Sequence, residues 1–363
     1  MKILFWVPYP TEGASNRYRI QQYFPYLEKH GIEYTFRPFW SSRAFKMLYR
    51  NKGAHLQKIF FFLKGTFTRI IDLFLVHRYD IVVIHRQAYP IGGAFFERIL
   101  SRMNKPIIFD FDDAIFLSDT CKSNFFAEAF KNPQKTSQII ALSSAVIAGN
   151  SYLAAFASQY NRNVSIIPTP VDENTYVPVQ KPHQETVVIG WMGSVTTSLF
   201  LTAIRTVLIK LVNTYPHVRC TIVGGEFEVP GVASITSKPW SLEGELSLLQ
   251  SFDIGIMPMP DNDWTKGKCG FKALLYMSVA IPCVCSPVGF NNEIITEGQN
   301  GLFARDEKEW FDKLALLIEN KELRQRLGSA GRKTLIEKYS LSANADKFIA
   351  VLQNVYATHC RKT

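Results

Sequence analysis

A loop rich in lysine and glycine precedes an apolar, leucine-rich stretch in the second half of the chain; its residues are Lys266, Gly267, Lys268 and Gly270. We expect a buried strand over 253–259 before this loop, a helix that starts at 269–271, and a second apolar strand over 281–285. Unpaired backbone N–H groups, the positive end of the helix dipole and ammonium groups would converge at the helix start. This pattern predicts an anion site, with diphosphate as the obvious ligand. The alternative is a solvated loop with glycine turns.

Three neighbouring residues extend this anion site. Lys272 lies inside the expected helix, just after Phe271, and either contacts the anion or is a surface lysine. Gly193 and Ser194 lie between an expected strand over 187–191 and a long helix, as in a turn that approaches a phosphate. Such junctions are common, so the signal is weak alone. It gains weight from the lysines, because both helix starts would face the same cleft.

A cluster of carboxylates, Asp110, Asp112 and Asp113, follows an expected buried strand over 107–109. Carboxylates this close repel one another, which is expected to raise a pKa and to give a general base or a partner for a substrate hydroxyl. His85 and Arg86 end a neighbouring strand and complete the group. Two alternatives are a divalent metal held by oxygen ligands, which we rank lower, and capping of the following turn by Asp112 or Asp113.

The elements that must position these residues alternate between apolar strands and helices, which predicts two doubly wound parallel sheets, an α/β fold. Ligands of such sheets lie beyond the strand C-termini. Strands are expected in the first half at 3–7, 34–36, 81–84, 107–109, 146–148 and 164–167. A second run begins at 187–191 and continues at 220–223, 233–235, 253–259 and 281–285. The polar, proline-rich residues 169–185 are expected to be a linker, and helices are expected at 307–320, 322–339 and 343–356.

The composition fits a globular protein of 363 residues with 47% hydrophobic and 20% charged residues. Six scattered cysteines form no zinc spacing and no disulfide framework, which favours a reducing cytoplasm. We expect no signal peptide, because prolines soon interrupt the first apolar residues, and no membrane span, because no run of about 18 apolar residues occurs.

The net charge of +10 is concentrated in one segment. Residues 36–78 contain nine lysines or arginines and a single acid, Asp72. Lys58, Lys64 and Arg69 recur within an apolar, aromatic stretch, as in a helix that lies in a bilayer interface, so we expect residues 40–78 to bind an anionic membrane surface. The alternative is a core-facing helix whose lysines reach solvent. No recognition motif supports nucleic-acid binding.

The segment GKCGFKALLYMSVAIPCVCSPVGFNNEII, followed by EGQNGLFA, resembles the donor-binding part of the retaining GT-B glycosyltransferases of glycosyltransferase family 4. The matched positions are Gly270, Met277, Pro282, residues 286–289, Glu293 and residues 300–302. Two glutamates of the family pattern fall here on Gly267 and Leu275, so the chain resembles a divergent branch that lacks both donor-site carboxylates.

The resemblance implies a GT-B architecture, with two Rossmann-like domains facing across a cleft. The first, residues 1–168, would bind the acceptor, and the second, residues 186–342, would bind the donor, while the final helix, 343–357, packs back on the first. Catalytic roles would fall to Asp110, Asp112, Asp113 and His85. The donor would contact Gly13, Arg17, Gly193, Ser194, Trp240, Lys266, Lys268, Gly270, Phe271, Lys272 and Glu293.

Some of these residues have competing structural explanations. Trp240 would lie at the nucleobase pocket, but a core or interface tryptophan is equally expected. Glu293 would accept a sugar or ribose hydroxyl, and helix capping competes with that role. Gly13 would let the backbone approach the donor, with Arg17 and Arg19 adding charge, whereas arginines on an amphipathic helix are most often solvated.

By resemblance, the reaction moves a sugar from a nucleoside diphosphate sugar to a hydroxyl of a lipid-linked or polysaccharide acceptor, with retention and without a metal or other cofactor. Departure of the diphosphate would be assisted by the helix start near Gly270 and by Lys266 and Lys268. The expected location is the cytoplasm, peripheral at the inner face of the plasma membrane, in cell-envelope polysaccharide synthesis. The alternatives are a nucleotide-sugar epimerase of the same fold and a non-catalytic subunit that binds a nucleotide or carbohydrate.

Overall fold

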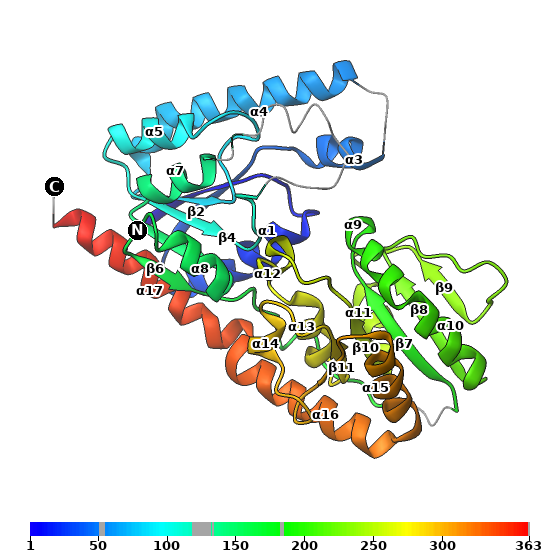
Figure 1. Cartoon of the computed structure of the whole chain (residues 1–363). Helices are drawn as coiled ribbons and strands as arrows, with labels where there is room; N and C mark the ends of the chain where they lie inside the picture. Colours follow the sequence, from blue (N-terminus) through cyan, green and yellow to red (C-terminus); the bar gives the residue numbers. More distant parts are fainter. Residues whose placement is uncertain (51–54, 118–131, 133, 182–184, 362–363) are drawn as a thin grey trace. The chain divides into compact units, whose positions relative to one another are not determined.

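The computed structural model describes residues 1–50, 55–117, 132, 134–181 and 185–361, with only the backbone for 48–50. The chain forms two compact units, residues 1–170 with 344–363 and residues 171–343 (Figure 1). Residues 51–54 of the basic segment and 182–184 of the expected linker lie outside the described residues.

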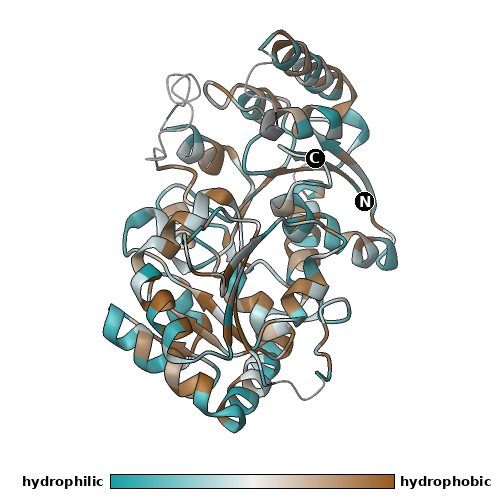
Figure 2. Ribbon diagram, turned by 90° about the vertical axis from the view of Figure 1, so that its right-hand side faces the viewer, coloured by the Kyte–Doolittle hydropathy of each residue, from teal (hydrophilic) through white to brown (hydrophobic). Residues whose placement is uncertain are grey.

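Unit 1 contains a six-stranded parallel sheet with the order β2-β1-β3-β4-β5-β6. Its strands are β1 Lys2–Val7, β2 Glu33–Pro38, β3 Ile81–His85, β4 Ile107–Phe111, β5 Ala145–Ala148 and β6 Val164–Ile166. Central strands β3, β4 and β5 are buried at every residue, because helices cover both faces of a doubly wound sheet. Figure 2 shows brown, apolar segments in the strands of the ribbon.

The helices of unit 1 are α1 Ala14–Arg19, α2 Phe24–Lys29, α3 Ser42–Arg50, α4 His55–Leu75, α5 Phe95–Arg102, α7 Lys135–Leu142 and α8 Ser151–Ala157. Short 3-10 turns, η1 Gln21–Tyr23 and η2 Val76–Arg78, follow α1 and α4. Helix α17, Leu341–Cys360, begins in unit 2 and belongs to unit 1 from Asn344. Phe348 of α17 stacks on Tyr23 with 4.3 Å between ring centroids. This contact places the C-terminal helix in the core of unit 1.

Helix α4 is polar on its buried side and apolar on its exposed side. Its buried residues are Gly65, Arg69 and Asp72. The large apolar side chains exposed on this helix are Leu56, Ile59, Phe60, Leu63, Phe67, Ile70, Ile71 and Phe74. A Cβ on Gly65 would lie 2.8 Å from the Phe39 carbonyl oxygen, so glycine allows the helix to approach the chain closely here.

The buried side of α4 is held by hydrogen bonds. Arg69 donates from Nε to the Ala88 carbonyl at 2.9 Å and from Nη2 to the Val7 carbonyl at 3.0 Å. Asp72 accepts a 3.1 Å bond from Trp6 Nε1 and pairs with Arg37 at 3.3 Å. The expectation that Arg69 lies on a membrane-facing surface is therefore wrong, because its guanidinium satisfies buried carbonyl groups.

Unit 2 contains a second parallel six-stranded sheet with the order β12-β11-β10-β7-β8-β9. Its strands are β7 Val187–Met192, β8 Val218–Val223, β9 Ile235–Lys238, β10 Ile254–Met257, β11 Cys283–Cys285 and β12 Leu302–Phe303. Aromatic rings pack directly against two glycines of this sheet. A Cβ on Gly190 would lie 2.0 Å from Phe252 Cγ, and one on Gly255 would lie 2.3 Å from Tyr276 Cγ. Glycine is needed at both positions for these rings to pack against the sheet.

The helices of unit 2 are α9 Val195–Ser198, η3 Leu199–Ile204, α10 Arg205–Thr214, α11 Glu245–Gln250, α12 Asp263–Lys266, α13 Phe271–Ser278, α14 Asn291–Ile294, α15 Glu307–Glu319, α16 Lys321–Thr334 and the π-helical η4 Leu335–Tyr339. The single long helix expected after Ser194 is thus three consecutive pieces. Within the described residues, Val195–Thr214 is the one stretch long and apolar enough to cross a membrane by length and composition. Its residues Leu201, Leu208 and Leu211 belong to the core cluster of unit 2, which accounts for its apolar character.

The sequence prediction of an α/β fold built from two parallel sheets is confirmed. Some details differ from the expectation. The strand expected at 233–235 lies at Ile235–Lys238. The first part of the expected linker is fixed to unit 2, since Val171 bridges to Ser340 and Arg332 donates 2.7 Å bonds to the carbonyls of Glu173 and Tyr176.

Candidate active site

The strand order of unit 1 reverses between β1 and β3, and side chains that follow these two strands meet there. Ser15 Oγ, on α1 after β1, lies 2.6 Å from His85 Nε2 at the end of β3. Ligands of doubly wound sheets bind beyond the strand C-termini at such a reversal. This edge is therefore a candidate site of unit 1.

Asp110, at the end of β4, is held by two basic side chains. His85 Nδ1 lies 2.6 Å from Asp110 Oδ2, and Arg19 contacts both carboxylate oxygens through Nε and Nη2. Arg19 also donates a 2.7 Å bond to the Ile167 carbonyl and is almost completely buried, so it is not a solvated helix residue. Burial opposes ionisation of Asp110, but the Arg19 guanidinium and the hydrogen bond to His85 outweigh it and lower the pKa of this carboxyl.

Asp112 is paired with Arg86. Arg86 Nε and Nη2 each lie 2.8 Å from Asp112 Oδ1. Burial again favours the neutral acid, but Arg86 and His85 lower the pKa of Asp112 far below its ordinary value. The expectation that mutual repulsion raises a carboxyl pKa in this cluster is wrong, because each of the two buried carboxylates has its own guanidinium partner.

Arg86 and Asp113 also lie at this edge. Arg86 has φ of +61°, a conformation that is strained for a residue with a side chain and often found at functional sites. Asp113 lies 3.9 Å from Arg86 Nη2 and accepts a 3.1 Å bond from the Ala114 backbone N–H.

The loop after β1 contains Gly13 and leads to Arg17. A Cβ on Gly13 would lie 2.6 Å from Tyr9 Cβ, and the Gly13 N–H donates to the Pro10 carbonyl at 2.9 Å. Glycine is thus required for this tight turn before α1. The Arg17 guanidinium lies 4.8 Å from the ring centroid of Tyr18.

In unit 2 the strand order reverses between β7 and β10, and Lys272 lies at that reversal. A Cβ on Gly193, after β7, would lie 2.7 Å from Lys272 Cε, and Lys272 Nζ lies 5.3 Å from the Trp191 ring. Burial, and next the nearby Lys268, lower the pKa of Lys272 to about 8. Two predicted anion-binding positions, Gly193 and Lys272, are therefore brought together.

The neighbouring lysines and Ser194 have defined positions. Lys268 Nζ lies 3.7 Å from the Trp264 ring centroid, a close cation–π contact. Lys266 Nζ instead lies 3.5 Å from Asp261 and 3.6 Å from Asp263. Ser194 is the exposed N-cap of α9, and its N–H donates to Thr197 Oγ1 at 3.3 Å. The two lysines near the start of α13 that face aromatic rings, Lys268 and Lys272, form the cationic part of this site.

Gly270 caps α13, and Phe271 is its first residue. Gly270 has φ of +60°, and a Cβ here would lie 2.4 Å from Ile294 Cδ1, so a side chain is excluded by both conformation and space. The helix therefore begins within the interval expected from the sequence.

Trp240 precedes α13 in the sequence, and Glu293 follows it. Trp240 Nε1 donates a 2.6 Å bond to Glu245 Oε2. A Cβ on Gly224 would lie 3.0 Å from Trp240 Cβ and 2.3 Å from the Gly193 carbonyl oxygen, which places Trp240 next to the Gly193 turn. Glu293 is exposed in the first turn of α14, and its carbonyl accepts a 3.1 Å bond from Tyr339.

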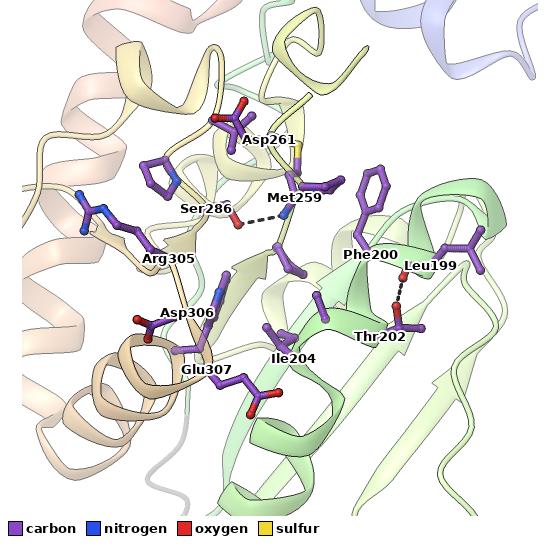
Figure 3. A pocket seen from close by; sticks show the side chains of 16 residues that line it. Leu199, Phe200, Thr202, Ile204, Met259, Asp261, Ser286, Arg305, Asp306 and Glu307 are labelled. Atoms are coloured by element: carbon purple, nitrogen blue, oxygen red, sulfur yellow. Dashed lines mark hydrogen bonds between the residues drawn. The ribbon is translucent and has the colours of Figure 1, made fainter. Parts of the chain in front are cut away.

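A cavity of about 630 Å³ opens at the C-terminal ends of β10 and β11 (Figure 3). It is lined by η3, by the residues after both strands and by the start of α15; labelled examples are Phe200, Met259, Ser286 and Arg305. The described lining includes none of the predicted site residues. The Phe200 ring lies 6.0 Å from the Trp264 ring, on which Lys268 rests, so the cavity adjoins the lysine site.

Sequence reasoning missed the aromatic supports Trp191 and Trp264 and did not single out Ser15, which follows Gly13 in the loop after β1. Position at a strand end was the available signal for Trp191, since β7 ends at Met192. No local pattern identifies Trp264 as the platform under Lys268.

Residues 186–320 match the family model described as glycosyl transferases group 1. Among curated proteins, none matches this chain significantly.

Several solved structures resemble nearly the whole chain. A glycosyltransferase from Rickettsia africae ESF-5 has a TM-score of 0.70 at 14% identity, with 98% of each chain covered. The sucrose-phosphate synthase from Thermosynechococcus elongatus has a TM-score of 0.68 at 12% identity, covering 99% of this chain and 100% of that chain. HepE from Anabaena, in complex with UDP and glucose, has a TM-score of 0.65 at 15% identity, covering 97% and 99%. At these identities the similarity shows the fold, which is the GT-B fold expected from the sequence.

Proposed function

We propose that this chain, whose residues 186–320 match the model of the group 1 glycosyl transferases, transfers the sugar of a nucleoside diphosphate sugar to a hydroxyl of a lipid-linked acceptor, with retention of configuration. A polysaccharide acceptor is the alternative. The observation that supports donor binding best is the contact between Lys272 and the Gly193 turn, at the strand reversal of unit 2.

Lys272 suits a diphosphate for an electrostatic reason. Its ammonium group is partly removed from water beside the Trp191 ring and lies near Lys268, so both surroundings disfavour the charged form in the free protein. A diphosphate at the Gly193 turn would restore favourable electrostatics to both lysines. The same cations would stabilise the diphosphate as it leaves, which is how a transferase lowers the barrier without a metal. That no metal or other cofactor is required stays a prediction.

The test is release of nucleoside diphosphate from UDP- and GDP-sugars. UDP-glucose is the first probe, because a structure of HepE is described in complex with it. Lys272→Ala should reduce both UDP affinity and turnover. Lys210→Ala is a matched control, since Lys210 also lies over a ring, Phe311, at 4.3 Å. An epimerised donor without release of diphosphate would instead indicate an epimerase, and binding without turnover a non-catalytic subunit.

The exposed face of α4 supports a lipid-linked acceptor. Eight large apolar side chains point outward there, although a soluble surface normally avoids such a stripe. The exposed charges beside it on α3, α4 and η2 are positive and include Arg43, Lys46, Lys64 and Arg78, whereas Asp72, the only acid of residues 36–78, is buried.

This combination favours an anionic membrane over a second copy of the chain. Two copies meeting through this face would bring like charges together, whereas an anionic leaflet would attract the cations and accept the apolar side chains. A cavity of about 590 Å³ between α3 and α4 has the same mixed character, with Arg43 and Lys64 beside Phe60 and Phe61. The protein would thus be peripheral at the cytoplasmic side of the plasma membrane, where it would act in cell-envelope polysaccharide synthesis.

A further inference from the structure

The cavity of about 590 Å³ in unit 1 has a wall to which both α3 and α4 contribute. Arg43 and Met47, four residues apart, lie on one face of α3. Leu56, Phe60 and Lys64 repeat at the same spacing along α4. The other residues of the lining are Ser41, Gln57 and Phe61. The volume is within the range of sites that hold a small molecule.

Contacts away from the cavity hold the two helices in unit 1. On α3, Ala44 is buried, and the ring centroid of Phe45 lies 5.3 Å from that of Tyr9. On α4, the ring centroid of Phe62 lies 5.8 Å from that of Phe39, which precedes α3 by three residues. The sides of both helices that face the core are thus occupied, and the cavity is formed by side chains that remain accessible.

The charged groups of the cavity are both cations, Arg43 and Lys64, and both are exposed. Among the described residues, neither forms an ion pair with an acid. On the helices of unit 2, by contrast, exposed lysines pair with acids four residues away, as Lys308 does with Asp312 at 2.7 Å. Two cations that face one cavity without an acid attract an anion, and a guanidinium binds phosphate oxygens through two parallel hydrogen bonds.

The apolar part of the wall is continuous with the exposed apolar face of α4. Leu56 and Phe60 are 84% and 63% exposed, and both line the cavity. Inorganic phosphate would leave these two side chains in water, whereas the chains of a lipid would cover them. A ligand with an anionic head and an apolar tail therefore uses both parts of the wall.

We propose that this cavity binds one anionic lipid, with the phosphate group between Arg43 and Lys64 and the chains on Leu56 and Phe60. General attraction of a basic helix to an anionic leaflet needs no defined site, because every cation near the membrane surface contributes to it. The cavity adds a stoichiometry of one lipid per chain and recognition of the phosphate itself. The inference goes beyond the proposed sugar transfer, since it concerns unit 1 alone and involves no step of that reaction.

The first test uses dihexanoyl phosphatidic acid below the concentration at which it forms micelles, so that no membrane surface contributes. Isothermal titration should show one site per chain. Arg43→Gln with Lys64→Gln should weaken binding by about tenfold or more. The control, Lys46→Gln with Arg78→Gln, removes the same charges from exposed positions outside the described lining and should change the affinity by less than about twofold at physiological ionic strength. An equal loss in the two double variants would assign binding to net charge and overturn the proposal.

Two other ligands separate the role of the phosphate from that of the chains. Dihexanoyl phosphatidylcholine has the same chains but no net charge, and inorganic phosphate has the charge but no chains. Both should bind at least about tenfold more weakly than dihexanoyl phosphatidic acid. Equal affinity for inorganic phosphate would overturn a lipid site, and equal affinity for the choline lipid would overturn the role of the cations.

A second pair of variants separates the cavity from the rest of α4. Leu56→Ala with Phe60→Ala should weaken binding of the monomeric lipid. Phe67→Ala with Phe74→Ala changes rings that are exposed on the same helix outside the described lining, and should weaken only binding to vesicles. The reverse pattern would overturn the proposal. A wild type that binds the monomeric lipid one to one but does not bind vesicles supports the cavity site and contradicts only the proposed membrane attachment.

Discussion

Lys272 lies against the turn at Gly193, so that a single methyl group added at position 193 would lie 2.7 Å from Lys272 Cε and 2.6 Å from the Trp191 ring. The loop after β7 and the first turn of α13 are thus fitted to each other at the point where the strand order of unit 2 reverses.

Gly193→Ala should weaken UDP binding by about tenfold or more, because the new methyl group must displace Lys272 or Trp191 from the site. Isothermal titration with UDP measures this effect. Gly93→Ala serves as the control, since its nearest neighbour would be 3.5 Å away. An unchanged UDP affinity in Gly193→Ala would show that the Gly193 turn is not part of the donor site.

The affinity for UDP should fall as the pH rises above about 8. The pKa of Lys272 is lowered to about 8 by burial and by Lys268, so the free protein loses this ammonium charge above that pH. A bound diphosphate favours the charged form and raises the pKa, so affinity is complete below about 8 and declines between the free and bound pKa values, by at most about tenfold per pH unit.

Titrations between about pH 7 and 10 measure this dependence, because the phosphates of UDP are already ionised there. Lys272→Arg is the informative control, since a guanidinium remains charged throughout. The same decline in that variant would assign the titration to another group.

Asp110→Asn should destabilise unit 1 by about 3–5 kcal/mol, because it leaves the buried guanidinium of Arg19 without its anion. The folded-state pKa of Asp110 is below its unfolded value, so its contribution to stability is present above the unfolded pKa and is lost as the pH falls through the folded pKa. Urea unfolding at pH 7 and at about pH 2.5 measures both effects, because the loss begins only below the ordinary carboxyl pKa of 3.8. Asp113→Asn, a less buried member of the cluster, should change stability far less. A loss equal to that of Asp110→Asn would argue against a special role of the Arg19 pair.

The protein should co-sediment with phosphatidylglycerol vesicles and bind weakly to phosphatidylcholine vesicles. Replacing Phe60, Phe67 and Phe74 by serine should abolish binding, because these exposed rings supply much of the apolar face of α4. The control replaces the exposed Leu242 and Leu316 of unit 2 by serine. Undiminished vesicle binding of the triple variant would rule out the apolar face of α4 as the membrane-binding surface. A wild-type dimer that the triple variant converts to a monomer would assign the face to a second copy.

The strands were predictable because parallel strands buried on both faces are continuous apolar runs, as in β3 and β5. The rule that ligands bind beyond strand ends then indicated His85, Asp110 and Asp112 together. Their protonation was not predictable, because it depends on Arg19 and Arg86, and no sequence spacing shows which guanidinium pairs with which carboxylate.

The hydrophobic pattern of the sequence also could not predict which face of α4 is buried. An amphipathic period shows that a helix has two faces, and the usual assumption buries the apolar one. Here Trp6, Arg37 and the carbonyl groups of Val7 and Ala88 offer polar partners in the interior, so the polar face of α4 is buried. That environment is assembled from distant parts of the chain.

The bonds from Arg69 to the carbonyls of Val7 and Ala88 have a mechanical consequence. A helix held only by apolar contacts can rotate or slide with little change in energy, because such contacts have no direction. Hydrogen bonds weaken steeply when their angles change. Arg69 therefore fixes the rotation of α4 about its own axis, so that the same residues of the helix face outward.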